Sequence, residues 1–285
     1  MKLRELRWRA AGHYGRPLDQ SFIEPLRGAK GLEIGGPSAL FRTGGLLPVY
    51  PELQDLDGVQ AEQAHVLWHG ELSEGSYDAG EPGLEGRLWL GEGGDLAFLG
   101  TDSYDAVLSS HVLEHLANPI GALEEWLRVL RPGGHMLIVL PHKEGCADHR
   151  RVTTSLEHML GDAEADTPED DMAHAEEVID LHDLARDPAA GGREALRERV
   201  LQNPVNRAMH HHCFTTRSAL RLLDHVGLEL LAVEARWPHD IYVMSRLPGP
   251  GKDRADNAVF LETSARTALR KSPFRVDRRG SGEAG

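Results

Sequence analysis

The sequence predicts an α/β fold with a Rossmann-like, mostly parallel sheet, helices on both of its faces and a closing antiparallel hairpin. From Lys30 onward, short apolar runs alternate with segments of helical period, as in repeated strand–helix–strand units. The segment 214–247 reads as one helix followed by two apolar runs, which predicts the hairpin. The alternation stops between His142 and Cys213, where we expect a largely helical insertion after the fifth strand.

The parallel strands are expected where apolar runs end in turn signals. The first run closes at the glycines of GLEIGG, a weaker second candidate lies near 53–59, and YDAVLSS predicts a strand over 104–110. The run 136–141 is entirely apolar. Continuous apolar character is typical of a central parallel strand that is buried on both faces.

Two helices are expected from apolar spacing and from their ends. The first is predicted by apolar residues that recur at helical intervals before RPGG, namely Ile120, Leu123, Leu127 and Leu130. The second should begin at Thr215 or Thr216, whose hydroxyls suit a helix cap, and should end near Gly227.

The chain divides into three predicted parts: an N-terminal helical segment (1–29), a main domain (30–247) that contains the insertion (142–213), and a C-terminal tail (248–285). The tail is rich in Pro, Gly, Ser and Arg, so we expect part of it to be mobile. Within the insertion, ten carboxylates and no Lys or Arg lie between Asp162 and Asp183. A solvated helical face and a cation site are both open explanations.

Composition excludes several classes of function. A net charge of −14 opposes binding to a phosphate backbone, so no nucleic-acid partner is expected. The two cysteines are too few for a disulfide framework or a four-cysteine zinc site, which favours a reducing, cytoplasmic location. The basic N-terminus lacks the apolar run of a signal peptide, and no later run is long enough to predict a membrane span.

Several residues near predicted strand ends suit a nucleoside ligand with a charged tail. Gly35 and Gly36 form a turn that lets the backbone approach a ligand, and a helix start after it would offer free amides. Glu33 could accept hydrogen bonds from a cationic amino-acid group. An acid after the second strand could bind ribose hydroxyls, and the candidates are Asp57, Asp55 and Glu52. Either of two acids in GEGGDLAF could meet an adenine amino group, namely Glu92 or Asp95.

Four segments between 30 and 141 resemble, in order and spacing, successive motifs of class I S-adenosylmethionine-dependent methyltransferases: GLEIGGPS, GEGGDLAF, YDAVLSSHVLEHLANP and VLRPGGHMLIVLP. The resemblance implies an enzyme that uses S-adenosylmethionine as methyl donor. It departs from the family pattern at Pro37 and Ser38, where many members have another glycine. The residues that it assigns to the donor are Glu33, Gly35, Gly36 and Pro37 in the first motif, Asp57 at the ribose, Glu92 with Asp95 and Leu96 at the adenine, and Ser110 with His111 at the end of the fourth strand.

The acceptor is expected to be a small molecule, with an oxygen of a sugar or secondary metabolite as the favoured site of methylation. Selection of the acceptor should fall to the insertion, with the N-terminal segment as a second candidate, because the sheet half holds the donor. Histidine is the natural general base near neutral pH, and the candidate bases are His142, His149, His210 and His212. A divalent metal ion is also conceivable, with Asp148, His149, His210 and His212 as its candidate ligands.

The histidine run 210–212 gives a further expectation. In an extended segment His210 and His212 would share a face, and His211 would point away from it. A run of solvent-facing histidines is the competing explanation.

Three other functions are weighed against methyl transfer. HVLEH at 111–115 fits the H-x-x-E-H pattern of some zinc proteases, with two histidine ligands and Glu114 as base. A dinucleotide oxidoreductase is compatible with the fold, but the first turn lacks a complete G-x-G-x-x-G. A catalytically silent partner protein that binds the cofactor is the third alternative.

Overall fold

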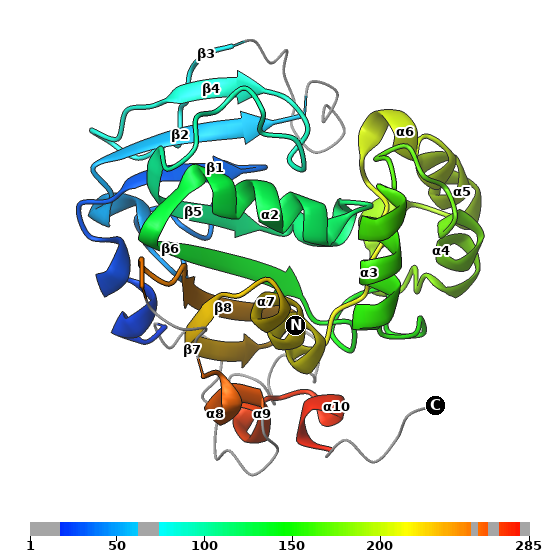
Figure 1. The fold of residues 1–285 in the computed structure, drawn as a ribbon. Coiled ribbons are helices and arrows are strands. Elements are labelled where there is room, and N and C mark those ends of the chain that lie inside the picture. The colour runs from blue at the N-terminus through cyan, green and yellow to red at the C-terminus, as the bar shows by residue number, and fades with distance from the viewer. Residues whose placement is uncertain (1–17, 62–73, 252–255, 262–267, 280–285) are drawn as a thin grey trace.

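The computed structural model describes residues 18–61, 74–251, 256–261 and 268–279. Its centre is an eight-stranded sheet of order β3-β4-β2-β1-β5-β6-β8-β7 (Figure 1). The strands are β1 (Lys30–Ile34), β2 (Asp55–Gln60), β3 (Gly75–Ser76), β4 (Arg87–Leu90), β5 (Tyr104–Ser110), β6 (Leu130–Pro141), β7 (Glu229–Arg236) and β8 (Asp240–Arg246).

The middle of the sheet is parallel and its last part is antiparallel. β4, β2, β1, β5 and β6 pair in parallel, whereas β8 pairs antiparallel with both β6 and β7. The short β3 is antiparallel to β4. This arrangement confirms the predicted α/β fold with its closing hairpin.

One face of the sheet is covered by α2 (Pro119–Val129) and α7 (Thr216–His225) (Figure 1). The Asn118 side chain caps α2, and Thr215 with Ser218 forms a reciprocal capping box at the start of α7. Trp126 is fully buried between α2 and the sheet. α2 ends at Val129, one residue earlier than the apolar spacing predicted, because Leu130 begins β6; α7 ends two residues before Gly227, as predicted.

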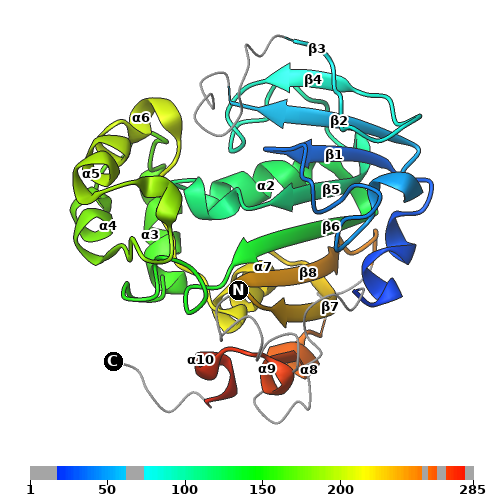
Figure 2. The same cartoon turned by 180° about the vertical axis from the view of Figure 1, so that it is seen from behind.

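The opposite face, seen in Figure 2, is covered by short 3-10 helices and loops: η1 (Gln20–Phe22), η2 (Glu24–Leu26) and η3 (Tyr50–Glu52). The helix expected directly after the first glycine turn is not formed, because residues 37–49 run through turns and bends. Gly44 and Gly45 would each cost about 1 kcal/mol in a helix, and Gly44 has a φ of +84°. Of the predicted N-terminal helical segment, residues 1–17 lie outside the described residues.

The insertion is helical, as expected, and lies beyond the carboxyl ends of the parallel strands (Figure 1). It has a small core of its own, which includes Val178, Leu196 and Met209. Its helices are α3 (Leu156–Ala165), α4 (Ala175–Leu181), η6 (Pro188–Ala190), α5 (Arg193–Leu201) and α6 (Asn203–Asn206).

The described parts of the tail pack against the main domain through α8 (Ala258–Leu261), α9 (Ala268–Lys271) and α10 (Arg275–Arg278). The Asn257 side chain accepts from the Leu230 amide of β7 and donates to the Leu228 carbonyl, at 2.9 and 2.8 Å. Phe274 is buried against His142. The predicted mobility of the rest of the tail falls on 252–255, 262–267 and 280–285, outside the described residues. No helix in the described part of the chain has the length and apolar character needed to span a membrane.

Candidate functional site

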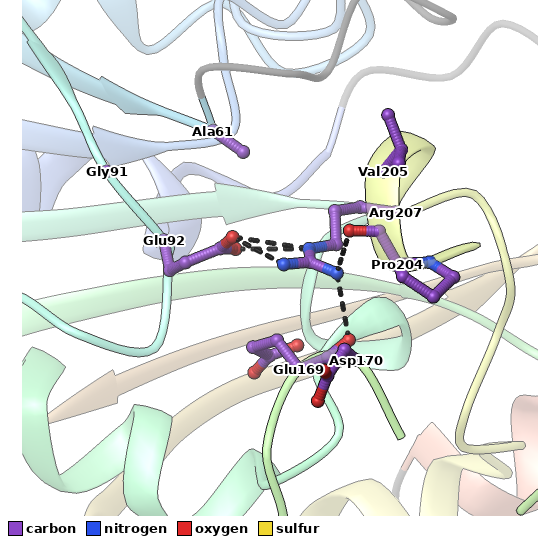
Figure 3. A pocket seen from close by; sticks show the side chains of 8 residues that line it. All are labelled: Ala61, Gly91, Glu92, Glu169, Asp170, Pro204, Val205 and Arg207. Atoms are coloured by element: carbon purple, nitrogen blue, oxygen red, sulfur yellow. Dashed lines mark hydrogen bonds and ion pairs between the residues drawn. The ribbon is translucent and has the colours of Figure 1, made fainter. Parts of the chain in front are cut away.

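Two adjoining cavities lie at the carboxyl ends of the parallel strands, the edge where open α/β sheets bind ligands. The larger has a volume of about 540 Å³ and reaches the insertion (Figure 3). The smaller reaches the ends of β1, β2 and β5. The two share Ala61, Glu92, Glu169 and Arg207, and the smaller is further lined by Ile34, Gly35, Val59, Gln60, Gly93, His111, Val112, His115 and Leu116.

The glycine turn after β1 forms part of the cavity wall. Gly35 has a φ of +74°, and a Cβ at this position would overlap Cγ2 of Val112. A Cβ on Gly36 would overlap the Glu33 carboxylate and the Tyr77 hydroxyl. Both positions therefore require glycine, and Gly35 leaves room for a ligand to approach the backbone.

Glu33 lies beneath this turn and is fully buried. Its carboxylate accepts hydrogen bonds from the Tyr50 and Tyr77 hydroxyls at 2.6 and 2.7 Å and from the Ser38 amide at 3.1 Å. Burial raises the pKa of Glu33, and these three hydrogen bonds act against that rise. The structure thus shows Glu33 holding the turn in place, whereas the sequence predicted contact with the donor's amino-acid end.

The end of β2 differs from the sequence prediction. Asp57 lies inside the strand, where its oxygens accept from the Arg87 amide and the Tyr104 hydroxyl at 2.7 and 2.8 Å, and it lines neither cavity. Gln60 is the last residue of β2 and lines the smaller cavity. Its Nε2 donates to the Gly36 carbonyl, but its buried Oε1 has no hydrogen-bond partner among the described residues. Such an orphaned acceptor is the kind of group that a ligand hydroxyl satisfies.

Sequence reasoning missed Gln60 because the second strand was located only approximately and an acid was sought at its end. The adjacent alternatives, Asp55 and Glu52, precede the strand end and line neither cavity. The usable signal was the apolar pair Gly58–Val59 immediately before Gln60.

Glu92 lines both cavities. Figure 3 shows its carboxylate facing the Arg207 guanidinium. Arg207, which follows α6 of the insertion, donates to both Glu92 oxygens, with the shortest distance 2.7 Å. No sequence signal pointed to Arg207. Asp95 is exposed and Leu96 is buried under α2, and neither lines a cavity. Of the three acid-loop predictions, the structure therefore brings only Glu92 to the site.

His111 follows β5 with a φ of +56° and lines the smaller cavity, whereas its neighbour Ser110 does not. Its Nε2 is 3.2 Å from Asp240, and its Nδ1 is 3.5 Å from Glu114. Although burial lowers the pKa of His111, interactions with these two carboxylates raise it to about 10. In this arrangement His111 is a cation at neutral pH. Pro37, the remaining donor prediction, lies just outside the lining residues of both cavities.

The four candidate bases do not meet in one site, which corrects the sequence prediction. His142 is fully buried, stacked on Phe274 at 3.7 Å between ring centroids and 3.3 Å from Asp277, so the tail encloses it. His149 pairs with Asp183 at 2.9 Å. These two histidines point to separate carboxylates on the tail and the insertion, away from both cavities.

The predicted metal set also separates. Asp148 contacts His210 at 2.6 Å and Arg151 at 3.1 Å, but its partner is not His149. His212 is buried 3.2 Å from the Ala117 carbonyl. No single group of described residues therefore contains all four predicted ligands.

The predicted alternation along 210–212 is wrong as well. The rings of His211 and His212 both lie about 6 Å from His174, whereas His210 packs against His115 at 4.6 Å. The reason is that 210–212 bends and is not part of a strand.

The H-x-x-E-H explanation requires two histidines on one face of a helix. Here only Leu113–His115 is helical, as the 3-10 turn η5, and His111 precedes it in a left-handed conformation. His111 groups with His239 and Asp240, whereas His115 groups with other residues. The zinc-protease pattern is therefore not formed.

A family model described as a methyltransferase domain matches residues 27–233. The chain belongs to this family of S-adenosylmethionine-dependent methyltransferases. This family match favours a methyltransferase over the two remaining alternatives, a dinucleotide oxidoreductase and a catalytically silent partner protein. The cavity fits the donor in two respects, namely the backbone approach at Gly35 and the orphaned Oε1 of Gln60.

Known proteins are similar to this methyltransferase at low sequence identity, and the curated relative aligns with only part of it. It is 29% identical over 162 residues to the ubiquinone biosynthesis O-methyltransferase of Parvibaculum lavamentivorans. The aligned region covers 56% of this chain and 58% of that protein. A crystal structure of an S-adenosylmethionine-dependent methyltransferase from Mesorhizobium loti matches with 15% identity and a TM-score of 0.46, covering 80% of this chain and 94% of that one. One from Aquifex aeolicus matches with 13% identity and a TM-score of 0.41, covering 86% and 100%.

Proposed function

We propose that this methyltransferase methylates a hydroxyl oxygen of a small molecule, such as a sugar or a secondary metabolite. The bound donor supplies a methyl group carried on a positively charged sulfur. The acceptor oxygen attacks the carbon of this methyl group in line with the carbon–sulfur bond. The work of the protein is to hold the two reactants in that alignment and to manage the hydroxyl proton.

The donor is proposed to lie along the carboxyl ends of β1, β2 and β4. Gly35 would allow its amino-acid end to approach the backbone, Gln60 Oε1 would accept from a ribose hydroxyl, and Glu92 would stand near the adenine. In support, all three line the smaller cavity in this order across the strands. Glu33, held by Tyr50 and Tyr77, acts through the turn as a positioning residue.

The observation that carries the choice of oxygen is the wall of imidazoles and carboxylates at the β5 end of this cavity. His111 and His115 line it, and Glu114 and Asp240 lie directly behind them. An oxygen acceptor must lose its proton when it gains a methyl group, and such groups bind hydroxyls and handle their protons. The similar Parvibaculum protein is named as an O-methyltransferase, which supports the same choice.

The test is a screen of hydroxylated metabolites in which release of the demethylated donor is measured. The methylated product is then assigned by NMR. A new O–CH₃ group is the expected result. A methyl group on nitrogen or carbon of the preferred acceptor would contradict the proposal.

The donor arrangement is tested by comparing Gln60→Leu with Asp57→Asn. Gln60→Leu removes the orphaned acceptor with little change in volume, and it also removes the hydrogen bond from Nε2 to the Gly36 carbonyl. Loss of a hydrogen bond of about 1 to 1.5 kcal/mol to the donor, together with a less firmly held turn, should weaken donor binding by at least about tenfold. Asp57→Asn keeps an oxygen for the Arg87 amide and should leave binding nearly unchanged. Calorimetric titration with S-adenosylmethionine measures both. The reverse order would restore Asp57 as the ribose ligand.

A further inference from the structure

Glu114 is the most unusual buried group beside the donor cavity. Its side chain is 1% exposed, and neither of its carboxylate oxygens has a hydrogen-bond partner among the described residues. Its nearest polar neighbours are Nδ1 of His111 at 3.5 Å and Nε2 of His115 at 3.9 Å. Buried carboxylates are normally hydrogen-bonded or bound to a cation, so these oxygens lack the partner that their burial requires.

The histidines around Glu114 are held in a common way. His115 Nδ1 lies 3.1 Å from the Met209 carbonyl, and His210 Nδ1 lies 2.6 Å from the Asp148 carboxylate. An acceptor at Nδ1 fixes the proton there and leaves Nε2 with a lone pair. Histidines that bind metal ions are oriented in this manner, by a carbonyl or carboxylate behind the ring.

We propose that Glu114, His115 and His210 bind a divalent transition-metal ion. One ligand atom from each lies within 4.8 Å of the others, and the rings of the two histidines are 4.6 Å apart. Two imidazoles and one carboxylate suit Zn²⁺, Mn²⁺ or Co²⁺, whereas Mg²⁺ prefers an all-oxygen site. His111 contacts the Glu114 carboxylate and is itself held by Asp240, so it orients that carboxylate.

The site differs from the one predicted by sequence, of which it retains only His210. Its ligands come from η5 and from the end of the insertion, 95 residues apart between His115 and His210. Asp148, predicted as a ligand, lies behind His210. A second group, His158, Asp162 and His212, lies within the insertion and lines neither cavity, so it serves as an internal control.

The place of the ion gives it a role in catalysis, and this step rests on the proposed function. His115 lines the donor cavity, so a ligand position of the ion that the protein leaves open can take an acceptor hydroxyl. Coordination lowers the pKa of a bound hydroxyl, so its proton passes to water. The oxygen–carbon bond then forms as the donor's sulfur–carbon bond breaks, and the sulfonium charge is neutralised. The acceptor class is therefore an alcohol or phenol that can bind a metal ion.

The experiment begins with full-length protein stripped of metal by a chelator and then titrated calorimetrically with Zn²⁺ and with Mn²⁺. Co²⁺ provides a visible absorption band that reports imidazole ligation. Glu114→Gln preserves volume and His210→Ala removes a ligand, and each should weaken Zn²⁺ binding more than about 100-fold. Asp148→Asn, one step further out, should weaken it about 10- to 100-fold. His158→Ala should leave this binding event unchanged.

Thermal denaturation and donor binding show whether each variant is folded. A wild-type protein that binds none of the three ions overturns the site, as does unchanged affinity in folded Glu114→Gln and His210→Ala. Loss of the ion in His158→Ala alone would place it in the second group and would also overturn it. The two proposals fail separately. Metal binding at Glu114 without O-methylation would leave the metal site in place and contradict the proposed function. O-methylation that persists in protein stripped of metal would contradict the catalytic role of the ion and leave the proposed function in place.

Discussion

At Gly35, a single hydrogen atom in place of a side chain satisfies two separate demands. The positive φ disfavours any residue with a Cβ, and the space that a Cβ would need is filled by Val112. Gly28 provides a matched comparison, because its φ is +69° but nothing lies within 4 Å of its missing Cβ.

We expect Gly28→Ala to destabilise the protein by about 1 kcal/mol through backbone strain, and Gly35→Ala to destabilise it more, because the clash with Val112 adds to the same strain. Only Gly35→Ala should also weaken donor binding, by at least about tenfold, because Val112 must move into the cavity. Urea denaturation and calorimetry measure the two effects. Equal donor affinity in both variants would show that the turn does not contact the donor.

Single residues differed in how far the sequence could locate them. Gly35, Glu92 and His111 follow from motifs whose spacing fixes their place at strand ends, and all three line the cavity. Glu33 was placed correctly along the chain, but its tyrosine partners come from separate segments that no local pattern connects to it. Arg207 could not be predicted, because its approach to Glu92 depends on how the insertion folds back over the sheet.

At the scale of elements, the connection between α3 and α4 brings Glu169 against the Glu92–Arg207 pair (Figure 3). Burial raises the pKa of Glu169 from 4.5 to about 7; the nearby Glu92 also raises it, whereas the Ala117 amide and Arg207 oppose the rise. The folded protein therefore holds a proton that the unfolded chain has lost between these two pH values.

The extra proton bound by Glu169 in the folded state makes the stability of the protein depend on pH. Because the folded state binds the extra proton, stability should fall as pH rises from about 4.5 to about 7, by an amount on the order of 2 to 3 kcal/mol. Glu169→Gln keeps an acceptor for the Ala117 amide but cannot ionise. Urea denaturation at pH 5 and pH 8 should show a smaller loss in the variant than in the wild type. Parallel pH profiles would contradict the assignment.

Elements with strong periodicity were predictable, and those shaped by tertiary contacts were not. The strands β5 and β6 and the helix α2 match their apolar patterns, although β6 begins earlier, at Leu130, because RPGG continues beside β5 and β8. β4 was not predicted, since four residues with an exposed arginine give too short a pattern. The turn-rich path of 37–49 was expected to be helical from the general strand–helix alternation, which its glycines override.

At the scale of the whole molecule, the tail contributes to the main core. Phe274 is 1% exposed and lies between His142 and Trp237. Phe274→Ala should cost about 3 to 5 kcal/mol, the range for removing a buried phenylalanine side chain. Phe98→Ala, at a residue 42% exposed, should cost about 1 kcal/mol or less. Chemical denaturation followed by tryptophan fluorescence measures both, and equal costs would mean that the tail adds nothing to the core.

Asn257 gives the tail a second effect, which is to protect the edge of the sheet at β7. β7 is the last strand of the sheet, and an edge strand presents unpaired main-chain groups that invite strand addition from another molecule. The Asn257 amide group occupies one such position at Leu230 and also satisfies the carbonyl just before the strand. A side chain thus stands in for the backbone of a ninth strand, so edge-to-edge aggregation along β7 is obstructed by the chain's own terminus.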